Sequence, residues 1–334
     1  MSDNISVGKA WSFIKNNFTL QENITDLDFA KSVIATNKDA LIQYSLIASN
    51  LHRSLEKCLE KLKQKNPANL NENEKNELRK LHKSLVKHLL TIQDISYTNM
   101  DLALRYFNEG ERISKIAPRV CIKSIRNDDV CTVFRNDRTR NSNLPEYCEN
   151  INETATFNIC RQQRTVIFND IPKDVKFFDY DNPRLNKKNA ISYYDQRNNF
   201  QRRIQDKFFY PDDEWMKCWS PYPQENGVTP RSCYKSTLVV SIQVSNLDIQ
   251  SLIENLVQSD DESRFSRNNW TPGTTYFGFL CFDHPMTYYF DRINDEKMGI
   301  FFSDILCPYF MYYMYYAELS PYSRLAKNLL ETET

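Results

Sequence analysis

The chain has 334 residues, which is long enough for two domains and a sizeable buried core. Its 43 basic residues balance its 43 acidic residues, so it lacks the overall positive charge of a dedicated nucleic-acid-binding protein. A hydrophobic content of 41%, with only 6 Gly and 13 Pro, is typical of a globular protein and excludes collagen-like and low-complexity classes.

The first third of the chain predicts two long helices. No Pro or Gly occurs between residues 26 and 65, and apolar or small residues recur there in alternating steps of three and four. After a polar connection the stripe resumes, and it continues as far as Leu102 and Tyr106. A spacing of about 3.5 residues is the pattern of a coiled-coil seam, and a short connection favours an antiparallel hairpin. The predicted seam residues are Leu41, Ala48, Leu51, Leu55, Leu62, Leu78, Leu81, Leu85 and Ile92.

The length of this hairpin has two interpretations. It is either a spacer or dimerisation element, or half of a helical bundle that residues 5–18 complete. The sequence leaves both open.

Beyond Gly110 the pattern changes from helices to short strands. Residues 119–125 and 130–134 are rich in β-branched and apolar side chains and flank a turn signal, so they predict a β-hairpin. The other predicted strands are residues 165–168, 234–242 and 275–283.

Two apolar segments, 246–258 and 296–318, predict helices that cover the resulting sheet. The sequence therefore predicts an α+β protein in three parts: a helical hairpin over residues 1–110, an α+β domain over 111–320 and a tail over 321–334.

We expect neither a membrane span nor secretion. Residues 300–319 approach the length of a span, but Asp304 and Glu318 lie inside this segment and its many tyrosines favour an interface or a core helix. The first residues lack the basic start and apolar stretch of a secretory signal. A cytoplasmic location follows as an expectation.

The residue pattern predicts no catalytic, metal or cofactor site. Nine scattered cysteines without a CxxC pair favour reduced, mostly buried thiols over a zinc site or a disulfide framework. No GxSxG, P-loop, HExxH or GxGxxG motif occurs. A histidine base would depend on His284, beside Asp283 and near Cys281. The acid pair Asp212 and Asp213 lies in a polar turn, where no flanking pattern would raise a carboxylate pKa by burial. We therefore predict a non-enzymatic protein.

A local basic cluster lies in residues 184–203, and aromatic residues follow it. Its two interpretations are a solvated surface and a nucleic-acid contact with base stacking, of which we expect the first.

Three sequence motifs resemble motifs of the GAF family of sensor domains and occur in the same order along the chain as in that family. They read TVIFNDIP at residues 165–172, YKSTLVVSI at 234–242 and YFGFLCFD at 276–283. The resemblance implies a central antiparallel sheet flanked by helices, with a ligand pocket roofed by the segment between the middle strands, here about residues 170–233. Motifs of the bilin-binding and cyclic-nucleotide-binding relatives are absent, so no ligand is named and no cofactor is expected.

The resemblance also implies a set of candidate ligand-binding residues. For Asn169 and Asp170 we expect an Asx-type corner first, and a ligand contact is the second interpretation. The full set is Asn169, Asp170, Tyr180, Asn182, Tyr234, Ser236, Phe279 and Asp283.

The resulting functional expectation is an intracellular sensor or regulatory protein, compatible with bacterial signalling. Its GAF-like domain would bind a small molecule or a protein, and its hairpin would mediate assembly as a homo-oligomer or pass a signal to an effector protein. One alternative is a structural or assembly subunit in which the GAF-like domain is a ligand-free packing module. The other is nucleic-acid contact through residues 184–203.

Overall fold

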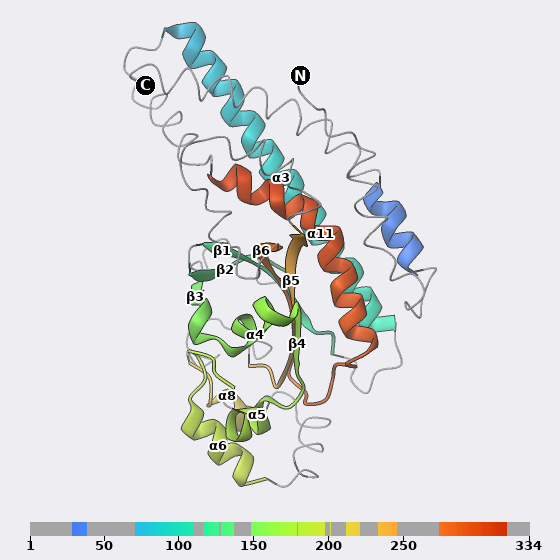
Figure 1. The fold of residues 1–334 in the computed structure, drawn as a ribbon, viewed down its shortest axis with the longest axis vertical. Helices are drawn as coiled ribbons and strands as arrows, with labels where there is room; N and C mark the ends of the chain where they lie inside the picture. Colours follow the sequence, from blue (N-terminus) through green and yellow to red (C-terminus); the bar gives the residue numbers. More distant parts are fainter. Residues whose placement is uncertain are drawn as a thin grey trace. The chain divides into compact units, whose positions relative to one another are not determined.

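The computed structural model describes the parts of the chain that carry the fold (Figure 1). The described residues are 29–38, 71–109, 116–126, 128–136, 148–178, 180–197, 201, 212–220, 233–245 and 274–318. They fall into two compact units, divided within two long helices near Ser96 and Cys307. The fold is α+β, with the sheet in the second unit.

Helix α3 (Glu72–Glu109) begins at a capping box. The Asn71 side chain accepts from the Glu74 backbone N–H at 3.0 Å, and the Glu74 carboxylate accepts from the Asn71 N–H at 2.9 Å. Acidic Glu72 and Glu74 also favour the positive end of the helix dipole. The sequence predicted this helix, and its start after the polar connection is confirmed.

The buried stripe of α3 differs from the predicted seam towards its C-terminal end. Leu78, Leu85 and Ile92 are buried as predicted, whereas Leu81 is half-buried. Further along, Ala103 and Phe107 are buried in place of their predicted neighbours Leu102 and Tyr106, which are half-buried. A straight helix repeats every 3.6 residues, so a stripe drawn at 3.5 falls behind by about one position over several turns.

The first arm of the predicted hairpin is described only over residues 29–38, which are helical. There the Tyr309 hydroxyl of α11 (Asn294–Glu318) donates to the Asn37 carbonyl at 3.3 Å. The seam residues Leu41, Ala48, Leu51, Leu55 and Leu62 lie outside the described residues, so the pairing of the two arms stays a prediction.

Six strands form one antiparallel sheet in the order β3-β2-β1-β6-β5-β4. The strands are β1 (Arg119–Arg126), β2 (Asp129–Arg135), β3 (Cys148–Asn150), β4 (Thr165–Phe168), β5 (Ser236–Ser245) and β6 (Thr274–His284). The predicted β-hairpin is confirmed as β1 and β2, and the other three predicted strands are confirmed as β4, β5 and β6. Strand β3 was missed because three residues are too short to show an alternating pattern.

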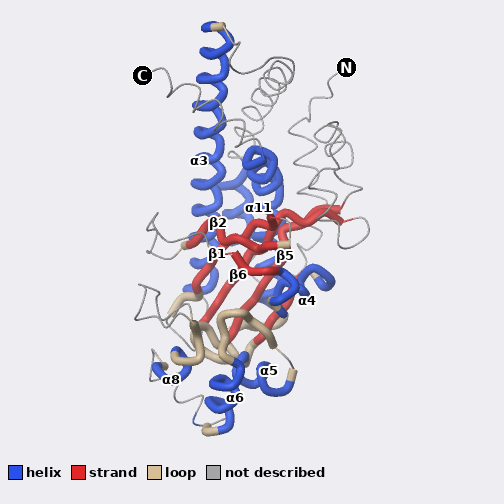
Figure 2. The backbone as a smooth tube through the Cα atoms, turned by 90° about the vertical axis from the view of Figure 1, so that its left-hand side faces the viewer, coloured by secondary structure: helices blue, strands red, loops and turns tan. Residues whose placement is uncertain are grey.

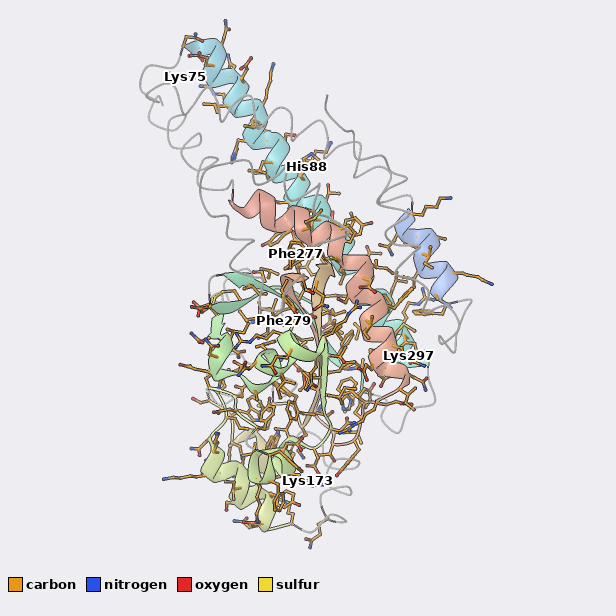
Figure 3. All side chains as sticks on the ribbon, viewed as in Figure 1. Lys75, His88, Lys173, Phe277, Phe279 and Lys297 are labelled. Carbon is orange, nitrogen blue, oxygen red and sulfur yellow. A yellow bond between two sulfur atoms is a disulfide. The ribbon has the colours of Figure 1, made fainter. Side chains whose placement is uncertain are left out.

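The side chains of β5 alternate between two covered faces of the sheet. Leu238 and Val240 face the first half of α11, where a Cβ added to Gly299 would lie 2.8 Å from Val240 Cγ2. Val239 lies on the opposite face, which η3 (Ile151–Glu153) and α4 (Ala155–Gln163) cover, and which we call the α4 face. Figures 2 and 3 show the curled sheet and the side chains that fill the space around it, Phe279 among them.

Helix α11 confirms the predicted covering helix at residues 296–318, while the one at 246–258 lies outside the described residues. In the described parts of the chain, no helix combines the length and the apolar character that crossing a membrane requires.

Asp304 of α11 forms an ion pair with Arg164, and burial raises the pKa of Asp304 to about 6, since Arg164 offsets only part of the burial effect. A raised pKa means that the folded chain holds this proton more tightly than the unfolded chain. The stability that Asp304 contributes is therefore fully present below its ordinary pKa near 3.8 and is lost as the pH rises through about 6.

We expect the stability of Asp304→Asn relative to the wild type to increase by about 2 kcal/mol when the pH rises from about 4.5 to about 7.5. Urea unfolding of both proteins at the two pH values measures this difference. A difference that stays constant with pH would contradict the expectation.

The segment between β4 and β5 carries three short helices, α5 (Ile171–Phe177), α6 (Lys187–Asp195) and α8 (Asp213–Met216). Each begins at an Asp or Asn whose side chain accepts a backbone N–H of the first turn. Figures 1 and 2 show these helices gathered at one end of the sheet.

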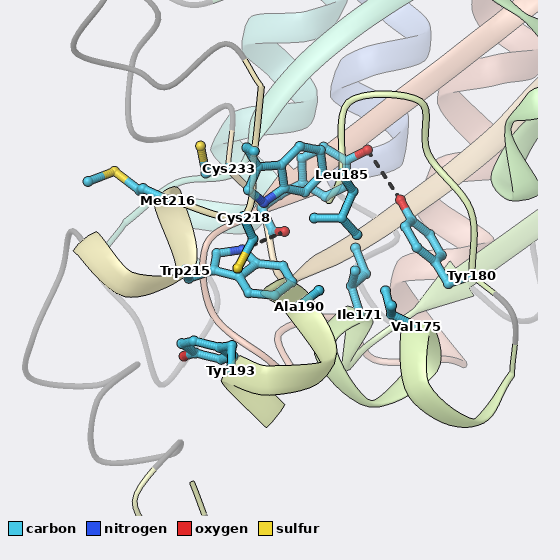
Figure 4. Packing of buried hydrophobic residues seen from close by; sticks show 12 residues of the cluster. Ile171, Val175, Tyr180, Leu185, Ala190, Tyr193, Trp215, Met216, Cys218 and Cys233 are labelled. Carbon is cyan, nitrogen blue, oxygen red and sulfur yellow. Dashed lines mark hydrogen bonds between the residues drawn. The ribbon is translucent and has the colours of Figure 1, made fainter. Parts of the chain in front are cut away.

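These helices and the chain around them share their own buried cluster, part of which Figure 4 shows. It comprises Ile171, Val175, Tyr180, Leu185, Ala190, Tyr193, Trp215, Met216, Cys218, Trp219, Cys233 and Tyr234. A segment that the sequence describes as long and polar therefore has an apolar core of its own.

Candidate functional site

A buried ion pair lies on the α4 face, where β1 begins and β6 ends. The antiparallel register places Arg119 opposite Asp283, and Asp283 opposite Thr237 on β5. The Arg119 guanidinium binds one oxygen of the Asp283 carboxylate, and the Thr237 hydroxyl donates to the other oxygen at 2.8 Å. The side chains of Arg119 and Asp283 are only 13% and 7% exposed. Burial opposes the charge on Arg119, but Asp283 raises the pKa of Arg119 above its ordinary value.

Three polar side chains of the adjoining segment meet beside this ion pair. The hydroxyls of Tyr180 and Tyr234 lie 3.3 Å apart, and the Asn182 amide donates to the Tyr234 hydroxyl at 3.1 Å. The guanidinium of Arg119 lies 5.9 Å from the centre of the Tyr234 ring, within cation-π distance. We call Arg119, Thr237, Asp283, Tyr180, Asn182 and Tyr234 the inner cluster.

Burial determines the protonation of the two tyrosines. It raises the pKa of both Tyr180 and Tyr234 above the ordinary value. Their hydroxyls therefore stay neutral, and each can donate one hydrogen bond and accept another. The inner cluster thus combines a cation, a carboxylate, three hydroxyls and an amide, a set suited to recognising a polar molecule through several hydrogen bonds.

Lys235, the residue after Tyr234, carries a further buried positive charge. Its ammonium group lies 2.6 Å from Asp212 Oδ2 and 2.8 Å from the Tyr193 hydroxyl, and that hydroxyl donates to Asp212 at 2.5 Å. Burial alone would raise the pKa of Asp212, but Lys235 lowers it below its ordinary value. These three residues, the Lys235 triad, join α6 and the start of α8 to the start of β5.

A third charged pair lies on the α4 face further along β1. Lys123 Nζ is 3.2 Å from Glu149 Oε2 and 5.0 Å from the centre of the Phe157 ring. Burial lowers the pKa of Lys123, while Glu149 raises it, and the net result lies above the ordinary value. The α4 face therefore carries one charged pair where β1 begins and another in the middle of β1.

The predicted ligand-binding residues separate into two groups. Tyr180, Asn182, Tyr234 and Asp283 meet in the inner cluster as described above. The others hold the backbone or the core. Asn169 exchanges two hydrogen bonds with the Phe290 backbone, Asp170 caps α5, the Ser236 hydroxyl donates to the Met286 carbonyl, and Phe279 packs on Phe157 at 4.8 Å between ring centres.

Asp170 therefore forms a helix-capping corner, as the first interpretation of Asn169 and Asp170 expects. Both ring nitrogens of His284 contact backbone groups. Its Nδ1 accepts from the Met286 N–H at 3.1 Å, which leaves Nε2 to donate to the Ile116 carbonyl at 2.8 Å.

Two sequence expectations were wrong. Asp212 is not in a solvated polar turn, because it is buried against Lys235. The thiols are not all reduced, because Cys131 and Cys148 form a disulfide between β2 and β3. The six cysteines described as free are all buried, as expected.

Sequence reasoning missed Arg119, Thr237, Lys235 and Lys123 as site residues. The signal that would have found the two lysines is a charge among buried strand residues, because Lys123 lies within β1 and Lys235 directly precedes β5, and a buried lysine is rarely unpaired.

The basic segment has a mixed outcome. In its described part, Lys187 pairs with Asp181 at 3.1 Å and Arg197 lies 4.3 Å from the centre of the Tyr193 ring. Of the aromatic residues that follow, Trp215 and Trp219 are buried and so are covered against base stacking. Arg202, Arg203 and Phe200 lie outside the described residues.

In the described parts of the chain, no group of three or more His, Cys, Asp or Glu side chains is placed to hold a metal ion. Comparison of the chain with protein-family models, with curated proteins and with solved structures gives no match.

Proposed function

We propose that this protein is a non-enzymatic cytoplasmic sensor or regulatory protein. Its GAF-like domain binds a polar small molecule at the inner cluster, and its long helices mediate assembly or pass the signal to an effector. The observation that carries this proposal is the inner cluster itself. A buried ion pair stabilises a fold no better than apolar side chains of similar volume, so buried charges gathered at one place mark a candidate recognition site.

The chemistry of the inner cluster favours binding over catalysis. Tyr180 and Tyr234 have raised pKa values, so neither supplies a phenolate base near neutral pH. Arg119 and Asp283 are held by each other, which fixes them as hydrogen-bonding groups of opposite charge. A molecule with both donors and acceptors would match this set.

The Lys235 triad offers a route from ligand to conformation. Tyr234 belongs to the inner cluster, and the adjacent Lys235 holds α6 and α8. A ligand that moves Tyr234 therefore alters the position of Lys235 and the anchoring of both helices. This connection supports a sensor in which binding changes the segment between β4 and β5.

Thermal unfolding in the presence of a panel of polar metabolites tests the proposal. We expect at least one compound to raise the unfolding temperature in a saturable way, since a ligand at about 100 times its Kd stabilises by about 2.7 kcal/mol. Thr237→Val keeps the side-chain shape but removes the hydrogen bond to Asp283, so it should weaken that response.

The matched control is Thr91→Val on α3, whose hydroxyl donates to the Lys87 carbonyl of its own helix. This variant should respond to the compound as the wild type does. The proposal fails if no compound shifts the unfolding temperature and native mass spectrometry shows only the bare chain.

One observation favours the assembly-subunit alternative. Part of the predicted site is filled by side chains, as Phe279 on Phe157 shows, and the groups of the inner cluster already bind one another. In that case native mass spectrometry would show an oligomer of bare chains.

A further inference from the structure

Two free cysteines face each other on the α4 face of the sheet. Cys121 on β1 and Cys281 on β6 are directly opposite in the antiparallel register. Both are buried, at 3% and 2% exposure, and both belong to the same apolar cluster as Val239 and Phe279. The Cβ atoms of directly opposite residues on antiparallel strands lie about 4.5–5.5 Å apart, so the two thiols are neighbours.

The surroundings give the two sulfurs different chemistry. The neighbouring Cys281 thiol, together with the charges of Lys123 and Arg119, lowers the pKa of Cys121 despite its burial. Burial and the neighbouring Cys121 sulfur raise the pKa of Cys281 well above its ordinary value. Of the two thiols, Cys121 is therefore the one that loses its proton more readily.

The same sheet already contains a bond of this kind. Cys131 and Cys148 are also directly opposite on adjacent antiparallel strands, and they are joined as a disulfide. The backbone of this sheet therefore accommodates a disulfide across a register pair.

Other buried thiols lack this arrangement. Those of Cys160, Cys218 and Cys307 each donate to a backbone carbonyl, and burial raises the pKa of each. A thiol that is protonated and bound to a carbonyl is a poor nucleophile. The pair at Cys121 and Cys281 is thus distinct from these three free cysteines.

We propose that Cys121 and Cys281 form a redox-active dithiol, which hydrogen peroxide oxidises to a disulfide that joins β1 to β6. The Cys121 thiolate attacks one peroxide oxygen, the O–O bond breaks, and the departing hydroxide takes up the proton that Cys121 had released, giving a sulfenic acid and water. The Cys281 sulfur then attacks the sulfenic sulfur, the S–O bond breaks, and the Cys281 proton leaves with the hydroxyl group as a second water. Two thiols are oxidised by two electrons and one peroxide is reduced. Hydrogen peroxide is not much larger than a water molecule, so it is a suitable oxidant for two buried thiols on a covered face of the sheet.

The position of the pair gives this oxidation a consequence. Cys121 and Cys281 lie two residues from Arg119 and Asp283 on the same strands and the same face. A covalent bond there would fix the separation of β1 and β6 beside the inner cluster. The inference concerns the oxidation itself and does not depend on what the inner cluster binds.

Peptide mapping after peroxide treatment tests the proposal on the intact protein. The folded chain is treated with hydrogen peroxide, its remaining thiols are alkylated in denaturant, and it is cut with trypsin. Cleavage after Lys and Arg places Cys121 in peptide 120–123 and Cys281 in peptide 268–292. We expect a new species in which these two peptides are joined, two hydrogens lighter than their sum.

The existing disulfide provides an internal control, because it joins peptides 127–135 and 141–161 and so gives a different mass. Cys121→Ser and Cys281→Ser should each abolish the new species, whereas the matched variant Cys307→Ser, which removes another buried thiol, should retain it. Near-ultraviolet circular dichroism verifies that each variant is folded.

Two outcomes would overturn the proposal. One is separate alkylation of Cys121 and Cys281 in the wild type after peroxide treatment that oxidises exposed methionines. The other is joining of the two peptides only when the chain is unfolded in guanidinium before oxidation, since the pairing would then owe nothing to the fold.

Discussion

Replacing Lys235 with Met is expected to lower the free energy of unfolding by about 3–5 kcal/mol. Lys235 is 1% exposed, and its ammonium group is held by Asp212 and Tyr193. Without the ammonium group, the buried Asp212 carboxylate loses the positive charge that Lys235 supplies. Helices α6 and α8 also lose the contacts with Lys235 that connect them to the start of β5. Chemical denaturation near neutral pH measures the change.

Two further variants decide whether the buried charge is the cause. Combining Lys235→Met with Asp212→Leu removes both charges, and we expect it to recover much of the lost stability. Lys217→Met disrupts the exposed pair of Lys217 with Glu214, 2.6 Å apart, and should change stability by less than about 0.5 kcal/mol. An effect of Lys235→Met as small as that of Lys217→Met would contradict the role of the triad.

The sheet was predictable because most of its strands have a recognisable local sequence pattern. Runs such as 165–168 and 234–242 contain β-branched and apolar residues and end at polar turns, and the observed β4 and β5 lie within a few residues of them. Helix α11 was predictable for a related reason, since its apolar length exceeds that of a strand.

The site was harder to predict, because its contacts join residues far apart in the chain. Arg119 meets Asp283 only because β1 and β6 are neighbours in the sheet, and no local pattern determines that order. Tyr180, Asn182 and Tyr234 were singled out through the resemblance, but their partner Arg119 was not. Asp212 was misjudged because the acidic Asp213 and Glu214 follow it, whereas its charge partner is Lys235, 23 residues later.

The disulfide shows the same limit. Cysteine spacing alone gave no reason to pair Cys131 with Cys148, because strand β3 is three residues long and lies in a polar segment. Once β3 is placed beside β2, the two cysteines are directly opposite. Register, rather than composition, determines which cysteines of this chain meet.

The second large effect is expected at Arg119. Arg119→Met removes the cation that pairs with Asp283 and lies over the Tyr234 ring. The buried Asp283 carboxylate then keeps only the hydrogen bond from the neutral Thr237 hydroxyl within the inner cluster. We expect the free energy of unfolding to fall by about 3–5 kcal/mol, as for other buried pairs that lose one partner. Arg119→Lys keeps the charge but loses the planar geometry of the guanidinium, so its loss should be smaller.

Urea unfolding of these variants, compared with Arg79→Met on α3, measures the effect. Arg79 pairs with Glu72 at 2.9 Å, but the two side chains are 34% and 64% exposed, so this matched control should lose less than about 1 kcal/mol. If Arg119→Met and Arg79→Met were equally mild, the Arg119 pair would behave as a surface pair, and the inner cluster would lose the buried charge on which its proposed recognition of a polar molecule depends. A large loss with Arg119→Met and partial recovery with Arg119→Lys would instead show that both the charge and the planar geometry of the guanidinium stabilise the inner cluster.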